Sequence, residues 1–176
     1  MTVTVADETR SLKIPLGRKL PTMTAAPRPR TQVTDATGRQ VAANVRRVRE
    51  ARGWSTYDLS RLLDEVGRPI APSAIAKVER AERRVDVGDL TALAAALRVN
   101  PSALLLPLTD DPAKTVEITG VGEVDAERAW DWLDGEMPIE RIEPGDPSGV
   151  LLQFLVYARP AGRRMQIFPN PDESAD

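Results

Sequence analysis

The chain of 176 residues contains no cysteine and no histidine, and only 4% of its residues are aromatic. Without cysteine there is no disulfide, no thiolate nucleophile and no thiolate metal site. Without histidine there is no Ser-His-Asp triad, no imidazole base and no imidazole ligand for zinc or haem. Carboxylate catalysis and an all-oxygen metal site remain possible chemistries, but the acidic pairs lack an accompanying nucleophile. We expect no enzyme activity, no metal and no cofactor.

Long hydrophobic runs are also missing. The longest apolar-rich stretch, residues 150–158, is far shorter than the roughly 20 residues that a membrane helix needs. Residues 1–23 lack the apolar segment of a signal peptide. The absence of cysteine fits a reducing compartment. These features predict a cytoplasmic protein without a membrane partner.

Charge is balanced in total but not along the chain. The 24 Lys and Arg residues and 26 Asp and Glu residues give a net charge of −2. Residues 1–36 carry a net +3, residues 37–108 a net +4, and residues 109–176 a net −9. This asymmetry indicates that the first two segments meet an anion, while the third would repel a DNA duplex.

Residues 1–36 are predicted to be a disordered basic arm, because they are rich in proline and threonine and show no hydrophobic period. The stretch Ala25–Arg30 is predicted to be an extended basic segment, either part of a solvated tail or a contact to DNA phosphate or the minor groove. Met23 is an alternative first residue, which would leave residues 1–22 outside the protein.

Residues 37–108 are predicted to form a compact domain of five short helices. Apolar residues recur at helical spacing, and capping residues precede each run. The first helix is expected over residues 37–52, opened by a capping box between Thr37 and Gln40 and ended by Gly53. The remaining helices are expected to begin near Ser55, Pro72, Asp86 and Asn100.

Residues 109–170 form an acidic C-terminal region that is expected to be mostly helical or α+β. A strand is expected over 115–119 and a helix from Asp125 to Gly135. Residues 150–158 fit either a helix capped by Ser148 or a buried strand. A second strand is expected over 165–168, followed by a disordered tail, 171–176. The region is interpreted as a dimerisation or regulatory unit, or as a satellite of the first core.

Four motifs follow one another in the helical domain: the stretch Val45–Ser55, the pair Leu59-Ser60, the segment Ile75–Arg80 and the stretch Asp89–Val99. In this order they resemble the Cro/repressor-type helix-turn-helix family, also called XRE-type or lambda-repressor-like. The resemblance covers residues 39–107. It implies a mainly α fold with a five-helix lambda-repressor-like DNA-binding domain.

The sequence departs from the family pattern at three places. Thr56 stands where the family often has a glutamine that contacts phosphate, and Ala81 stands where it has a small glycine. The link between the second and third helices, around residues 65–69, is about three residues longer than the usual tight turn. A longer link can change the tilt of the third helix.

The resemblance implies that the second helix crosses the DNA backbone and the third lies in the major groove. Ser73, Ala74 and Lys77 would then meet base edges, with Pro72 close by. Thr56 would position the complex on a phosphate. The remaining predicted backbone contacts are Arg80, Arg83 and Arg84.

Several of these residues also have structural interpretations. Ser73 can cap the third helix instead of contacting a base, and Ala74 can act only as a helix former. Glu79 is expected to tie the third helix to the first through an arginine. Trp54 and Tyr57 are expected to pack at the edge of the core.

The function expected from these features is a sequence-specific transcriptional regulator, a repressor that binds double-stranded DNA as a homodimer. A dimer is expected because one helix reads only a few base pairs. The alternative is an antitoxin or protein-interaction adaptor with the same fold, since the third helix lacks glutamine and asparagine. The operator and any effector ligand are not encoded in a recognisable motif.

Overall fold

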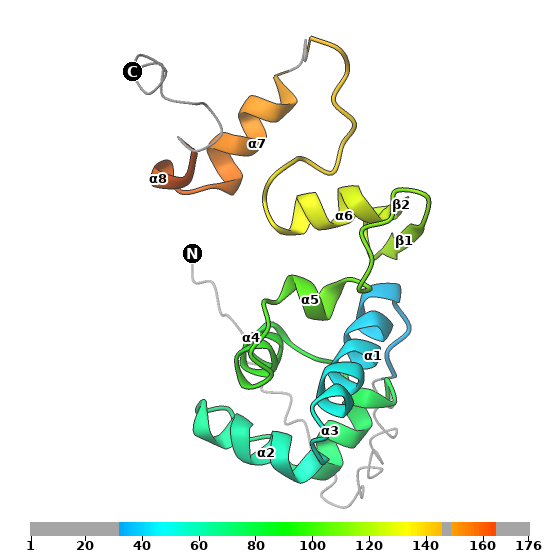
Figure 1. Cartoon of the computed structure of the whole chain (residues 1–176), viewed down its shortest axis with the longest axis vertical. Coiled ribbons are helices and arrows are strands. Elements are labelled where there is room, and N and C mark those ends of the chain that lie inside the picture. The colour runs from blue at the N-terminus through cyan, green and yellow to red at the C-terminus, as the bar shows by residue number, and fades with distance from the viewer. Residues whose placement is uncertain (1–31, 146–148, 165–176) are drawn as a thin grey trace, which may run out of the picture.

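A computed structural model describes residues 32–145 and 149–164. Within these residues the chain forms eight helices and one two-stranded sheet (Figure 1). The expectation of a mainly helical fold is therefore confirmed. The expected arm up to residue 31, the Ser148 cap, the strand 165–168 and the tail 171–176 lie outside the described residues.

The five expected helices are present and pack around one core. They are α1 (Ala36–Ala51), α2 (Thr56–Glu65), α3 (Pro72–Glu79), α4 (Val87–Ala96) and α5 (Ser102–Leu105). Helices this short are not stable alone in water, so packing must hold them. Burial of each large aliphatic side chain contributes about 1.5–3 kcal/mol. Those buried almost completely in this core are Val45, Leu59, Leu63, Ile75, Leu93, Leu97 and Leu104.

The predicted capping box at the start of the first helix is wrong. The N-cap of α1 is Asp35, whose Oδ1 accepts a hydrogen bond of 2.7 Å from the Gly38 amide. A carboxylate in this position also interacts favourably with the positive end of the helix dipole. Thr37 consequently lies inside the first turn, where its hydroxyl is used by another part of the chain.

The signal for the end of α1 is confirmed. Arg52 is the C-cap, and Gly53 follows it with a φ of +67°, in the left-handed region that favours glycine. The start of α4 is also confirmed, because Asp86 caps it and accepts from the Asp89 amide at 2.7 Å.

The acidic region begins with a β-hairpin of which only half was expected. The predicted strand corresponds to β1 (Thr115–Ile118), which pairs antiparallel with β2 (Gly122–Asp125). Gly122, a residue type that is typical of turns, pairs with Ile118 at the start of β2. Residue 122 has a φ of +96°, a backbone conformation that favours glycine. Because glycine is also typical of turns, the local pattern did not indicate a strand here.

The helix expected after the hairpin is α6 (Ala126–Leu133), capped by the Asp125 carboxylate, which accepts from the Arg128 amide at 2.9 Å. Its Ala126 and Ala129 are fully buried against the hairpin. Together with residues of α5's end and β1 they form a second, smaller apolar cluster: Leu106, Val116, Ile118, Ala126 and Ala129.

Hydrogen bonds fasten this second cluster to the five-helix part and to the segment that follows it. The Thr119 amide donates to Thr37 Oγ1 at 2.9 Å, and the Thr37 amide donates to Thr119 Oγ1 at 3.2 Å. Trp130 Nε1 donates to the carbonyl oxygens of Pro107 and Thr109, at 3.1 and 3.0 Å. The hairpin and α6 therefore lie next to the start of α1 and the end of α5, as Figure 1 shows.

Residues 150–158, which fit a helix or a strand, form the helix α7 (Val150–Ala158). A short helix, α8 (Ala161–Arg164), follows and was not expected. Only Leu155 of α7 is fully buried, whereas Leu152 is 60% and Tyr157 87% exposed. No helix in the described part of the chain is both long and apolar enough to cross a membrane.

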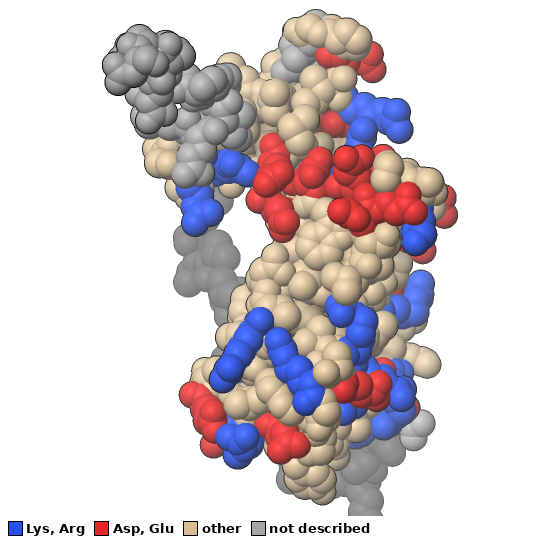
Figure 2. Space-filling model, in the orientation of Figure 1, with Lys and Arg blue, Asp and Glu red and all other residues tan. Residues whose placement is uncertain are grey.

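The charge asymmetry of the sequence is visible on the surface. Asp and Glu side chains form a band across α6, while Lys and Arg side chains lie mainly over the helices below it (Figure 2). Acidic residues that contribute at α6 and the segment before it are Asp110, Glu127, Asp131 and Asp134.

Candidate nucleic-acid interface

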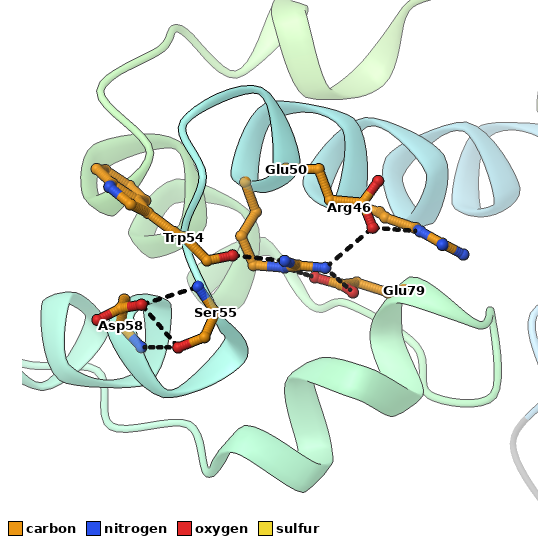
Figure 3. A network of polar contacts seen from close by, with 7 residues as sticks. Arg46, Glu50, Trp54, Ser55, Asp58 and Glu79 are labelled. Atoms are coloured by element: carbon orange, nitrogen blue, oxygen red, sulfur yellow. Dashed lines mark hydrogen bonds and ion pairs between the residues drawn. The ribbon is translucent and has the colours of Figure 1, made fainter.

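The start of α2 is built by a reciprocal capping box. The Ser55 amide donates to Asp58 Oδ2 at 2.8 Å, and the Asp58 amide donates to Ser55 Oγ at 3.2 Å (Figure 3). The cap predicted at Ser55 is thus confirmed. Thr56 becomes the first residue of α2, in the turn whose amide groups have no acceptor within the helix. This turn can donate to a phosphate oxygen.

The side chain of Tyr57 is more exposed than the sequence predicted. Tyr57 was expected to pack at the edge of the core, but it is 75% exposed in the first turn of α2. Trp54 does pack against the core, and the Arg52 guanidinium lies 5.1 Å from its ring centroid. Tyr57 therefore lies on the exposed surface at the start of α2, and it was not among the predicted DNA-contacting residues. Its position two residues after the Ser55 cap could have indicated exposure.

The helix α3 begins without a side-chain cap. Ala71 is its N-cap and Pro72 its first residue, so Ser73 does not cap it. The alternative in which Ser73 serves as the N-cap is therefore wrong. The exposed Ser73 makes no hydrogen bond with its hydroxyl among the residues described, which leaves that group available to a ligand.

One side of α3 is buried and the opposite side is polar. Ile75 and Val78 are 1% and 2% exposed and face the core. Ser73, Lys77 and Arg80 are exposed at helical spacing on the other side. The structure brings these three predicted residues onto one face. Pro72 and Ala74 are half-buried, and Ala74 packs against the core as well.

The predicted backbone-contacting arginines differ from one another. Arg80 binds Glu82 through two hydrogen bonds of 2.9 Å. Arg83 Nη2 donates to Asp89 at 2.7 Å, so this side chain is engaged inside the protein. Arg84 is exposed.

The charge of Arg84 also acts on the cap of α1. The hydrogen bond from the Gly38 amide is the main cause that lowers the pKa of the Asp35 carboxyl, and the Arg84 charge makes a smaller contribution in the same direction.

The far end of α3 is fixed to α1. Arg49 Nε and Nη2 donate to the two oxygens of Glu79 at 2.6 and 2.9 Å (Figure 3). Arg49 Nη1 donates to the Trp54 carbonyl at 2.6 Å. This geometry confirms the interpretation of Glu79 as a tie between the two helices. The Glu79 carboxylate is the main cause that raises the pKa of the Arg49 guanidinium above its usual value.

Two buried polar residues were missed as structural supports. The Asn44 side chain is 2% exposed and donates to the carbonyls of Leu104 and Leu106, at 3.0 and 2.7 Å. Asp89, which lies in the first turn of α4, is also 2% exposed. The helical period places residue 89 on the inward side of α4. A charged residue at such a position was the one signal in the sequence that could have indicated its burial.

These elements define a helix-turn-helix DNA-binding domain: α2 and α3 form the pair, α3 carries an outward polar face, and α1, α4 and α5 support it. Residues 45–104 match the helix-turn-helix family model, which supports the resemblance of this part of the chain to the Cro/repressor type. The domain is of the kind found in DNA-binding transcription regulators. No curated protein and no solved structure matched the chain in the other two comparisons.

Proposed function

We propose that the protein is a sequence-specific transcriptional regulator that places α3 in the major groove of double-stranded DNA. The observation that carries this proposal is the outward face of α3, where Ser73 and Lys77 are exposed and make no ion pair or side-chain hydrogen bond in the described part of the chain. A hydroxyl and an ammonium group suit base-edge acceptors, and the ammonium group also suits phosphate.

The groups around α3 are arranged for binding the backbone. The first turn of α2, at Thr56, and the first turn of α3, at Pro72, present the positive ends of two helix dipoles. Arg80 and Arg84 follow α3 directly and are assigned to phosphates, whereas Arg83, which sequence reasoning had placed with them, is held by Asp89. Their effect is on affinity for any duplex, because phosphate contacts carry no sequence information.

The remaining parts of the proposal follow from geometry and charge. A homodimer would supply two half-sites and hence useful specificity. Repression needs only occupancy of the DNA, and no enzyme activity is invoked. The net −9 of residues 109–176 favours a position for this region away from the duplex, where a dimer contact or a regulatory contact is compatible with it.

Binding across a salt series tests the proposal. Fluorescence anisotropy of the full chain with genomic duplexes should give affinities that fall linearly on a log-log plot with salt, with a slope of about −0.9 per phosphate contact. At least one duplex should bind more tightly than the others at every salt concentration. Absence of salt-sensitive binding to any duplex would contradict it.

A protein-interaction adaptor or antitoxin is the second candidate function. It is favoured by the exposed apolar side chains of α7, in particular Leu152 and Tyr157. This candidate predicts that a toxin-like gene lies beside the gene for this protein, and that the protein product of that gene forms a stable complex with it. A transcriptional regulator without such a partner gene would not show that complex.

A further inference from the structure

The two loops that flank α3 each send an arginine to one buried carboxylate. Arg68 lies in the link before α3, and its Nε donates to Asp89 Oδ1 at 2.9 Å. Arg83 lies in the loop after α3, and its Nη2 donates to Asp89 Oδ2 at 2.7 Å. The Asp89 side chain is 3% exposed, so both hydrogen bonds end in a site that water hardly reaches.

The start of α4 holds the first of these arginines a second time. Arg68 Nη2 contacts Asp86 Oδ2 at 3.1 Å, and Asp86 also caps α4. The guanidinium lies beside Gly88 in the first turn of α4: a Cβ at that residue would be 3.6 Å from Arg68 Cζ, which is an ordinary contact, and 3.3 Å from Asp86 Oδ1. A small residue at position 88 is therefore compatible with the contact between Arg68 and Asp86.

The link itself has few other means of holding its shape. All residues from Asp64 to Pro69 are exposed, and Gly67 has a φ of +79°. The link is held at its ends by the Arg68 amide, which donates to the Leu63 carbonyl at 2.9 Å, and by Ser60 Oγ, which donates to the Ile70 carbonyl at 2.7 Å. The Arg68 side chain is what joins the link to α4.

We propose that Asp89 is the positioning residue for α3, and that it acts by holding the link before the helix and the loop after it through Arg68 and Arg83. This inference rests on the proposed function, since it assigns a role in DNA reading to a residue that touches no DNA. A link longer than the family's tight turn leaves the tilt of α3 less constrained. The Asp89 carboxylate, in the first turn of α4, restores that constraint by binding both Arg68 and Arg83.

Such a role has a signature that separates it from phosphate binding. Arg68 is paired with two carboxylates, so its charge is already compensated within the protein. Its removal should disturb the geometry of base reading and leave the number of phosphate contacts unchanged. Discrimination between duplexes should then fall, while the salt dependence of binding stays the same.

The test compares the full-length wild type with Arg68→Gln. This substitution leaves Arg83 on Asp89, so the buried charge keeps a partner. The matched control is Arg128→Gln, which removes an arginine paired with Asp125 at 3.6 Å at the start of α6. The first measurement is amide hydrogen exchange of the free proteins. Arg68→Gln should raise the exchange rates of the amides in residues 72–80 by about tenfold, because one charge-assisted hydrogen bond is lost. The exchange rates in α1 should stay unchanged.

The second measurement uses a duplex that the wild type selects from a random pool and a scrambled duplex of equal length. Arg68→Gln should bind the selected duplex about tenfold more weakly, as after losing one base-pair contact. It should bind the scrambled duplex within about twofold of the wild type, with the same salt slope. Arg128→Gln should match the wild type in both experiments.

Two results would overturn the inference. Unchanged exchange in residues 72–80 would show that Asp89 does not constrain α3 through Arg68. A loss of affinity for both duplexes with a flatter salt slope would make Arg68 a phosphate contact. If the wild type selected no duplex, the proposed function would fail, and the exchange measurement would still decide whether the carboxylate holds α3.

Discussion

Arg49 binds Glu79 through two parallel hydrogen bonds and so joins the last turn of α1 to the end of α3. The side chains are only 11% and 8% exposed, so the pair is largely shielded from water. Because the Arg49 side chain also donates to the Trp54 carbonyl, the same guanidinium orients the turn that leads into α2.

Removal of Glu79 should therefore lower the stability of the folded protein considerably. Glu79→Ala leaves a largely buried guanidinium without its bidentate acceptor, and we expect the free energy of unfolding to fall by about 3 kcal/mol. Urea denaturation followed by far-UV circular dichroism measures this. The control is Glu65→Ala, which removes the exposed partner of Arg61 and should cost far less, because solvent screens that pair. Equal losses in the two variants would contradict the assignment.

The buried amide of Asn44 should be equally important for the junction between α1 and the end of α5. Asn44→Ala leaves the Leu104 and Leu106 carbonyls without their donor inside the protein, and the expected cost is about 2–3 kcal/mol. Asn100→Ala serves as the comparison, because the Asn100 side chain accepts one exposed hydrogen bond, from the Ala103 amide near the start of α5, and its loss should cost about 1 kcal/mol. The account requires the Asn44 variant to melt at the lower temperature.

Helix caps predict how stability depends on pH. A hydrogen bond from the Gly38 amide lowers the pKa of Asp35, one from the Ser55 side chain lowers that of Asp58, and one from the Asp89 amide lowers that of Asp86. Each folded-state pKa lies below the unfolded value of about 3.9. The stabilisation is thus fully present above that value and is lost as the pH falls through the folded-state pKa values.

The melting temperature should accordingly be flat between about pH 6 and pH 5 and fall below about pH 4. Asp58→Asn should be less stable than the wild type at pH 6, and the difference between the two proteins should shrink as the pH falls. Differential scanning calorimetry at several pH values measures both curves. A difference that grows on acidification would mean that the sign of the linkage is wrong.

Base reading and phosphate binding should separate by mutation. Lys77→Ala is expected to weaken binding to a preferred duplex by about 1–3 kcal/mol and to relax the preference at one position. Arg84→Ala should weaken all duplexes alike and reduce the magnitude of the salt slope by about 0.9. Lys114→Ala, in the acidic region, is the control for loss of one exposed lysine. If Lys77→Ala and Arg84→Ala changed affinity in the same pattern, the two roles would have to be reassigned.

The five helices could be predicted because the information for them is local. Val41, Val45 and Val48 recur at helical spacing and are all buried, and Ser55 is followed by Asp58 as a capping box requires. Exposure of Ser73 and Lys77 follows from the same period, since Ile75 and Val78 occupy the buried side of α3.

What could not be predicted depends on partners far apart in the chain. Thr37 has the local pattern of a cap, but its hydroxyl accepts from Thr119, which lies 82 residues further on. Asp89 has the pattern of a first-turn acidic residue, and its burial becomes explicable only when Arg68 and Arg83 converge on it. The second strand was missed because glycine at residue 122 has the pattern of a turn.

Selection of bound duplexes from a random-sequence pool by the full-length protein tests the central claim most directly. The account predicts enrichment of a palindrome, with two half-sites whose centres are about one helical turn, 10–10.5 base pairs, or a multiple of it apart. Sequencing after several rounds reports the motif and its symmetry together. A pool that stays random after selection, at a salt concentration where the protein still binds DNA, would contradict sequence-specific reading by α3.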